Sequence, residues 1–150
     1  MISLDETRLF GTALLDSFKG IIETGTLKLM AGNPNASVEA IESALPLATL
    51  PVTSLNLAVV GYQIRMTGTP KFTVLRPGKI TWFMLDCRQI GVEDADAVNN
   101  GYIKGEVSYT GSSSVLRDTA ELQLNTLLIS TGDEGALSEI TPVQFSIKLG

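Results

Sequence analysis

The chain has 150 residues, of which 44% are hydrophobic and 18% charged, and its mean hydropathy is +0.23. This length fits one domain that buries roughly 70% of its extended surface without disulfides or metals, and we expect a partner to cover part of so apolar a surface. Eleven basic and sixteen acidic residues leave a net charge of −5 and a pI near 4.6, which argues against nucleic acid as a partner.

Neither the single cysteine nor the first residues indicate an export route. Cys87 lies in an apolar stretch, which predicts a buried, inert thiol and fits assembly in a reducing cytoplasm. Residues 1–8 carry acids where a signal peptide carries basic residues, and no stretch reaches the roughly 18 apolar residues of a membrane span. We expect a protein that is neither exported by that route nor inserted in a membrane.

The first expected element is a helix over residues 4–19, within an N-terminal arm of residues 1–22. Residues 3–6 (Ser-Leu-Asp-Glu) match the capping box, apolar residues then recur near helical spacing, and Gly20 is a possible terminator. The apolar face is long for an isolated helix, so the helix either closes the core of the next domain or serves as an assembly arm. Its candidate interface residues are Leu9, Phe10, Leu14 and Phe18.

After residue 25 the spacing of apolar residues changes to two, which predicts strands. A Gly-Asn-Pro-Asn loop that contains Pro34 ends the first strand. The segment 36–44 is small, polar and acidic, and we expect a surface excursion that can contain a helical turn. The strands expected in this half are residues 26–31, 47–52, 54–60 and 62–67, with Tyr62, Ile64 and Met66 on one face of the last.

The most apolar stretch, residues 80–87, is expected to be the central strand. From Trp82 to Leu85 every residue is apolar, so both faces of this strand must be kept from water. Residues 72–75 precede it, and the turn 76–79 contains a Pro-Gly pair that suits a type II turn, which predicts a hairpin. One face then looks into a core between sheets, and the other is covered by the N-terminal helix or by a neighbouring subunit.

The second half of the sequence predicts further strands and sets the fold class. Alternating residues predict strands over 103–109, 120–130 and 143–149, with a turn at residues 131–135. About eight to ten strands separated by turn signals predict an all-β fold for residues 23–150. The expected form is a jelly-roll-like β-sandwich with one short N-terminal α-helix, and a closed barrel is the alternative.

The sequence offers little for catalysis. It contains no histidine, which removes Ser-His and Cys-His pairs and the commonest zinc ligand. Asp86 ends the central strand, and we interpret it as a carboxylate bonded to backbone amides rather than as a buried acid. Glu93, Asp94 and Asp96 could ligate calcium, but their spacing does not match an EF-hand loop, and a solvated loop is the better interpretation. We expect neither an enzyme nor a cofactor.

Several runs of the sequence resemble small virion proteins of tailed bacteriophages. Residues 23–36 and 47–50 are similar to that family's Gly-Thr-Leu strand, Gly-x-x-Pro loop and Leu-Ala-Thr-Leu strand. Residues 80–83, 120–125 and the segment from 129 onward also lie where that family has a strand, another strand, and a Gly-turn with a final strand. The resemblance covers most of residues 23–149. The departures are Met30 in place of an aromatic and Arg76, Pro77, Gly78 and Lys79 in place of a Gly-rich entry to the central strand.

The resemblance implies a structural protein of the virion, assembled in the host cytoplasm. It most simply implies a capsid decoration, or cement, protein that binds the outer shell through apolar surface and free strand edges. The expected partners are the major capsid protein and copies of the chain, as a dimer or trimer, without nucleic acid or membrane. Pro34 and Gly132, in the turns, are further candidate interface residues. Two alternatives stay open: a tail, baseplate or head-tail connector component, and a carbohydrate-binding or adhesive β-sandwich module.

Overall fold

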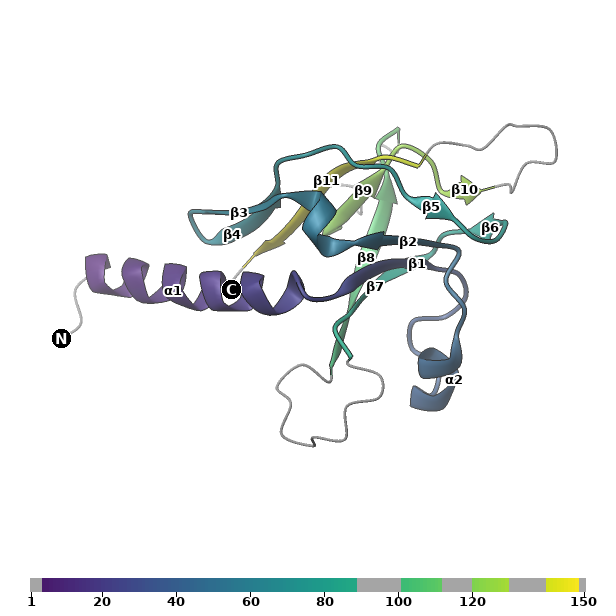
Figure 1. Ribbon diagram of the computed structural model, residues 1–150, viewed down its shortest axis with the longest axis horizontal. Helices are drawn as coiled ribbons and strands as arrows, with labels where there is room; N and C mark the ends of the chain where they lie inside the picture. Colours follow the sequence, from purple (N-terminus) through teal and green to yellow (C-terminus); the bar gives the residue numbers. More distant parts are fainter. Residues whose placement is uncertain (1–3, 89–100, 112–119, 130–139, 149–150) are drawn as a thin grey trace.

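The protein is described by a computed structural model that covers residues 4–88, 101–111, 120–129 and 140–148 (Figure 1). Strands predominate, and the chain begins with its longest helix. In chain order the elements are α1 (Leu4–Ile22), β1 (Thr26–Met30), α2 (Val38–Ser43), β2 (Ala48–Pro51), the 3-10 turn η1 (Val52–Leu55), β3 (Leu57–Val60), β4 (Gln63–Met66), β5 (Thr73–Val74), β6 (Gly78–Lys79), β7 (Trp82–Asp86), β8 (Tyr102–Tyr109), β9 (Leu122–Leu124), β10 (Leu128–Ile129) and β11 (Pro142–Lys148).

Nine strands of the described chain form one mixed sheet in the order β3-β4-β11-β9-β8-β7-β1-β2-β5, and β10 pairs with β6. Neighbouring strands are antiparallel except β8 and β9, which are parallel. The sheet curls, so that Phe83 on β7 meets Phe145 on β11 edge to face, with ring centroids 5.9 Å apart. The expected all-β, sandwich-like fold with an N-terminal helix is confirmed.

One continuous core fills the inside of the curled sheet. It receives side chains from β1, β2, β7, β9 and β11, and it includes both phenylalanines of the ring contact. Gly105 on β8 lies directly beneath the ring of Phe83, because a Cβ at that position would overlap the ring atoms Cζ and Cε1. This glycine lets the largest core side chain of β7 lie flat against the neighbouring strand.

The central strand is confirmed, whereas the predicted hairpin is wrong. All five residues of β7 are buried, and β7 lies between β1 and β8, which pair with it along its length. The preceding segments go elsewhere: β5 pairs with β2, and β6 pairs with β10. The expected type II turn at residues 76–79 is not formed either, because Gly78 is the first residue of β6. The backbone groups of a buried five-residue strand need partners along its whole length, which β1 and β8 supply and the two-residue strands β5 and β6 cannot.

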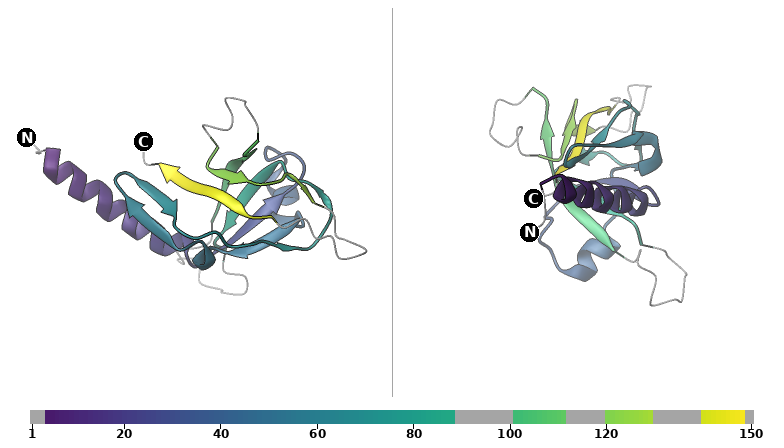
Figure 2. Two further views of the ribbon diagram at one scale, coloured as in Figure 1. Left: turned by 90° about the horizontal axis from the view of Figure 1, so that it is seen from above. Right: turned by 90° about the vertical axis from the view of Figure 1, so that its left-hand side faces the viewer.

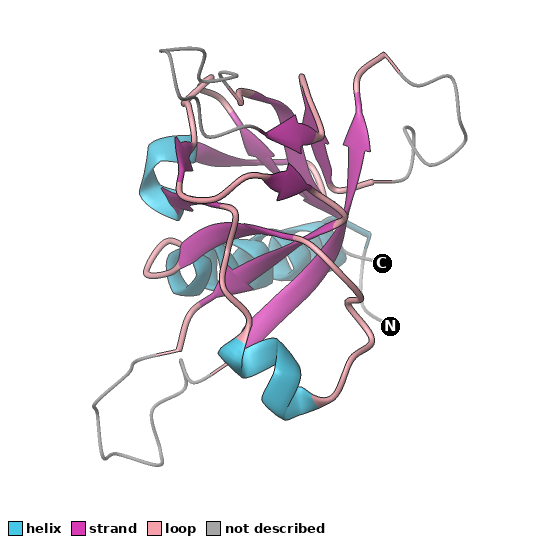
Figure 3. Cartoon of the chain, turned by 90° about the vertical axis from the view of Figure 1, so that its right-hand side faces the viewer, coloured by secondary structure: helices cyan, strands magenta, loops and turns pink. Residues whose placement is uncertain are grey.

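The outer face of β7 is covered by α2, which corrects the expected cover by α1 or by another subunit. Helix α2 is the helix at the bottom of Figure 3. Trp82, Met84 and Met30 form a second apolar cluster on this face of β7, and Ile41 of α2 packs on them and is 3% exposed. Ser37 caps α2 by accepting a hydrogen bond from the amide of Ala40 at 3.2 Å. The segment expected to be a surface excursion thus carries the apolar side chain that closes the sheet.

Helix α1 continues to Ile22, three residues beyond the expected end, and Gly20 does not terminate it. Leu15 and Ile22 are fully buried and belong to the same core as the sheet, while Phe18 is partly buried against it. The helix packs on β3 and β4, and its N-terminal part extends past them (Figures 1 and 2). In the described residues, neither α1 nor α2 has the length and apolar character that crossing a membrane requires.

The predicted strands of residues 54–60 and 62–67 shorten into the β3–β4 hairpin. Residues 52–55 form η1 instead, and Asn56 follows it in the left-handed conformation, with φ of 49°. Val60 pairs with Gln63, which leaves Gly61 and Tyr62 as the two-residue turn. Tyr62 is consequently exposed, although the alternation had placed it on one face with Ile64, which is buried, and Met66, which is partly buried.

Candidate interaction surface

The end of the molecule at α1 presents apolar side chains to solvent. Leu14 on α1 is 48% exposed, and the β3–β4 hairpin that packs beside the helix exposes Val60 (52%) and Tyr62 (42%). We name these three residues the helix–hairpin surface. A helix of 19 residues is about 28 Å long, and its buried residues Leu15 and Ile22 lie in its second half. Leu14 therefore points away from the core that its neighbour Leu15 enters.

The candidate interface residue Pro34 lies in a loop that is fastened to the sheet. The hydroxyl of Thr81 donates to the carbonyl of Gly32 at 2.7 Å, and Lys104 Nζ donates to the carbonyl of Pro34 at 2.7 Å. Gly32 has φ of +84°, a conformation that favours glycine. Pro34 itself is half-buried. The Gly-x-x-Pro motif thus has a structural reason that does not depend on a partner.

The same loop leaves two amide side chains in solvent. Asn33 and Asn35 are exposed, and Asn33 Oδ1 accepts a hydrogen bond from the amide of Asn35 at 2.9 Å. Trp82 holds the start of the loop, since its Nε1 donates to the carbonyl of Ala31 at 3.2 Å. The loop thus presents a polar turn to solvent, and hydrogen bonds from Thr81, Trp82 and Lys104 hold its backbone to the sheet.

Asp86 is the centre of a charged group at the end of β7. Its carboxylate accepts hydrogen bonds from Arg88 Nε at 2.8 Å and Arg88 Nη2 at 2.7 Å, and from Lys28 Nζ at 2.7 Å. The Arg88 guanidinium also lies over the ring of Tyr102, 5.4 Å from its centroid. Hydrogen bonds from Arg88, opposed by burial and helped by Lys28, hold the pKa of Asp86 well below its usual range. A carboxylate held ionised in this way cannot serve as a general acid.

Cys87 follows Asp86 and is 8% exposed. Burial, and then the negative charge of Asp86, raise the pKa of its thiol. A reactive cysteine needs the opposite shift, because the thiolate is the nucleophile. The expectation of a buried, inert thiol is therefore supported by the surroundings of Cys87.

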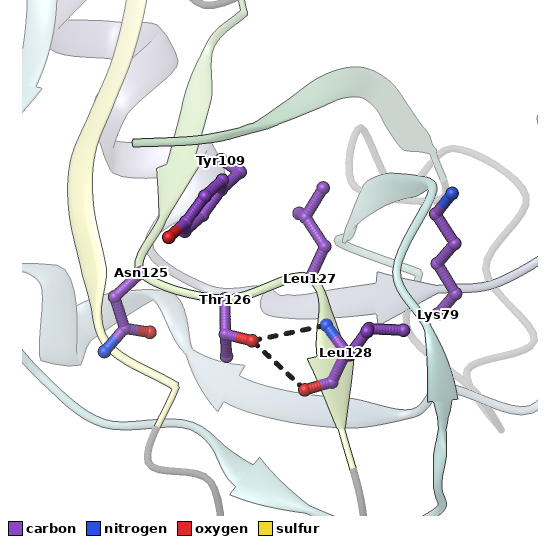
Figure 4. Close-up of a pocket in the computed structure, with 6 residues that line it drawn as sticks. All are labelled: Lys79, Tyr109, Asn125, Thr126, Leu127 and Leu128. Atoms are coloured by element: carbon purple, nitrogen blue, oxygen red, sulfur yellow. Dashed lines mark hydrogen bonds between the residues drawn. The ribbon is translucent and has the colours of Figure 1, made fainter. Parts of the chain in front are cut away.

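At the far end from α1, a pocket of about 330 Å³ opens beside β6 and β10 (Figures 1 and 4). Tyr109 and Leu128 stand at its rim, 44% and 68% exposed, and Lys79 is its only charged lining residue. Thr126 shapes one wall, since its hydroxyl bonds with the amide and the carbonyl of Leu128 at 3.3 and 3.1 Å (Figure 4). We call this the Tyr109 pocket. It has apolar side chains at its rim and polar side chains along its walls.

Among the candidate interface residues, the structure places Leu14 in solvent, and Phe18 and Pro34 half-buried. The side chains of Leu9 and Phe10 lie outside the described part of the molecule, and so does Gly132.

The carboxylates considered for calcium, Glu93, Asp94 and Asp96, also lie outside the described residues. In the part of the chain that is described, no group of three or more cysteine and carboxylate side chains is arranged to hold a metal ion.

Sequence reasoning missed the exposed residues of the hairpin and of the Tyr109 pocket. Val60 and Tyr109 both lie in strands where alternation marks apolar residues as core, and alternation alone does not reveal which strand ends leave the core. The Gly-Tyr pair at residues 61–62 was the available signal for Tyr62, because glycine next to a polar or aromatic residue suits a two-residue hairpin turn.

Comparisons with known proteins add no relative to this description. No protein-family model, no curated protein and no solved structure matches the chain. The fold defines an all-β protein with a projecting helix, and inferences about function rest on its surface.

Proposed function

We propose that this chain is a structural protein of a tailed-bacteriophage particle, a decoration protein that binds the outer face of the capsid. The observation that carries the proposal is the placement of exposed apolar side chains at two opposite ends of a completed core. The helix–hairpin surface lies at one end and the Tyr109 pocket at the other (Figure 1). A protein that fastens neighbouring shell subunits needs two such contact surfaces.

The amount of exposed apolar area also supports an assembled state. Nine large apolar side chains of the described residues are at least 36% exposed, while the core and the outer face of β7 are closed from within the chain. Scattered exposed leucines are ordinary, but the residues of each end surface lie on adjoining elements. The exposed residues are Leu14, Leu45, Val60, Tyr62, Leu75, Ile103, Tyr109, Leu128 and Val143.

The charged groups of the described chain support a role without catalysis. The groups whose pKa values depart from their ordinary range are Asp86, which is held ionised, and Cys87, which is held protonated. Catalytic acids, bases and thiol nucleophiles need shifts in the opposite directions. Both residues fit a structural role at the end of β7.

The test is the location and copy number of the protein in purified particles. Hundreds of copies on the shell would support decoration, whereas six or twelve copies would favour the tail, baseplate or connector alternative. Absence from particles would overturn both proposals. The helix–hairpin surface is tested by Leu14→Lys, which should weaken shell binding at least tenfold without lowering the melting temperature. Ser17→Lys, at an exposed position of the same helix, is the matched control.

A second candidate function, a carbohydrate-binding module, is favoured by Tyr109 alone. Its exposed ring stands at a pocket whose lining also includes Asn125, Thr126 and Lys79, and sugars bind to aromatic rings flanked by hydrogen-bonding groups. Glycan-array binding that is lost in Tyr109→Ala and kept in Tyr62→Ala would favour this candidate over decoration. Shell binding without any glycan binding would rule it out.

A further inference from the structure

The first half of strand β8 is an open edge inside the sheet. β7 pairs with residues 102–106 of β8, whereas β9 pairs only with residues 107–109. Within the described ranges, no strand lies against residues 102–105 on the side away from β7. An edge strand of this kind exposes backbone donors and acceptors to any strand that can approach it.

The backbone of β8 points alternately toward β7 and toward this edge, as antiparallel pairing requires. The amide of Cys87 donates to the carbonyl of Gly101 at 3.0 Å, so the odd-numbered residues of β8 face β7. The amide of Glu106 donates to Glu121 Oε2 at 2.9 Å on the other side, so the even-numbered residues face the edge. The edge is thus closed by a carboxylate at Glu106 and open before it.

Tyr102 and Lys104 therefore present two amides and two carbonyls to the edge. Among the described residues, none of these four backbone groups has a hydrogen-bond partner. Donors and acceptors that alternate at the spacing of a strand are matched by the backbone of another extended strand. Another extended backbone is therefore the kind of occupant that matches all four groups.

The side chain between these two residues also lacks cover. Ile103 is opposite Leu85 and shares its inward face, yet it is 36% exposed, whereas Leu85 is fully buried. Ile103 borders a small cavity of about 100 Å³ that Phe18 and Ile21 of α1 also line. A strand added at this edge would bring an apolar residue over Ile103.

We propose that the occupant is the same edge of a second copy, paired antiparallel about a two-fold axis at Ile103. Tyr102 of each copy then lies opposite Lys104 of the other, and each such pair exchanges two backbone hydrogen bonds. The two Ile103 side chains lie side by side on the inward face and cover one another. This inference rests on the proposed function, because a decoration protein is expected to make contacts between its own copies.

The charges of β8 select this register over its neighbours. A two-fold axis at Lys104 places that residue opposite itself, and like charges in directly opposite positions are unfavourable. An axis at Gly105 requires the backbone of Glu106, whose amide is already bonded to Glu121. With the axis at Ile103, each Lys104 instead lies opposite the partner's Tyr102, which is uncharged, so no like charges are directly opposite one another.

Disulfide trapping tests the register. In a Cys87→Ser background, Ile103→Cys should form a disulfide-linked dimer on mild oxidation, because directly opposite residues of a non-hydrogen-bonded pair have the Cα separation that a disulfide needs. Lys104→Cys is the matched control and should cross-link at least tenfold more slowly. Equal or faster cross-linking of Lys104→Cys would overturn the register.

Two further variants test the edge without disturbing the fold. Lys104→Pro removes an amide that faces the edge and not β7, so the ladder between β7 and β8 stays intact, while Lys104→Ala keeps that amide. We expect light scattering to find a dimer for the wild type and for Lys104→Ala, and a monomer for Lys104→Pro with unchanged circular dichroism. A monomeric wild type across the micromolar range, or a dimer that survives Lys104→Pro, would overturn the edge contact. Neither result bears on the copy number in particles, so the proposed function stands or fails separately.

Discussion

Replacement of Trp82 by alanine removes the largest side chain from the outer face of β7. Trp82 is 2% exposed, packs with Met30, Met84 and Ile41, and donates from Nε1 to the carbonyl of Ala31 at 3.2 Å. Burial loss and the cavity left behind cost about 3 to 5 kcal/mol for a buried tryptophan. Loss of the hydrogen bond adds at most about 1 kcal/mol, since Ala31 is exposed and water can bond to its carbonyl in the variant.

The matched variant Trp82→Phe keeps an aromatic ring in the cluster, so it retains most of the packing while it removes the Nε1 donor and part of the indole volume. We expect Trp82→Phe to lose about 1 to 2 kcal/mol and Trp82→Ala to lose the larger amount, a large share of the 5 to 15 kcal/mol typical of a domain. Urea unfolding followed by far-ultraviolet circular dichroism measures both, since Trp82 is the only tryptophan and fluorescence is lost with it. A Trp82→Ala midpoint close to the wild-type value would refute the closed outer face.

The remaining predictions concern α1, the glycine under Phe83, and Asp86. Leu15→Ala should cost about 2 to 4 kcal/mol because Leu15 is buried, whereas Leu14→Ala should change thermal stability by less than about 0.5 kcal/mol; equal effects would contradict the orientation of α1. Gly105→Ala should lower the melting temperature by several degrees or prevent folding, because its Cβ overlaps the Phe83 ring; a stabilised variant would exclude the contact. Asp86→Asn should cost on the order of 2 kcal/mol at pH 7. The pKa of Asp86 is lowered by folding, so its contribution is present above the unfolded value of about 3.9 and is lost as the pH falls toward the folded value. Unfolding curves of wild type and Asp86→Asn should therefore converge in acid, and a gap that persists there would refute the ion pairs.

The central strand could be predicted from the sequence because a run of apolar residues has few solutions. Residues 82–85 cannot expose either face, and the structure buries all of them. The strand's partners could not be predicted in the same way. The Pro-Gly turn at residues 77–78 is a local signal, whereas the pairing of β7 with β1 depends on residues distant in sequence. Local turn chemistry therefore suggested a hairpin that the long-range pairing overrides.

The composition of residues 36–44 did not indicate that α2 covers the outer face of β7. The segment that holds α2 is rich in small and acidic residues, and among the described side chains of α2 itself only Ile41 enters the cluster on β7, with Ala44 packed against it just after the helix. One buried residue per helix gives no periodic signal. Leu14, one of the candidate interface residues of the helix, is exposed in the structure, and its part in an interface stays a prediction. The unpaired edge of β8 could not be assigned to particular residues from the sequence, because no sequence signal shows where the pairing between two strands ends.

The long-range pairing of β7 has a consequence for how the protein reaches its native state. β1 cannot complete its pairing until β7 has been synthesised, more than fifty residues later. Until then the only strand that can pair with β1 is its neighbour in sequence, β2. Such a topology closes large loops before it gains contacts, so spontaneous refolding is expected on the scale of milliseconds to seconds or slower. During that interval the incompletely folded chain exposes apolar side chains and unpaired strand edges, which favour aggregation. Expression yield should accordingly depend on growth temperature and chaperone supply more strongly than the stability of the finished molecule would suggest.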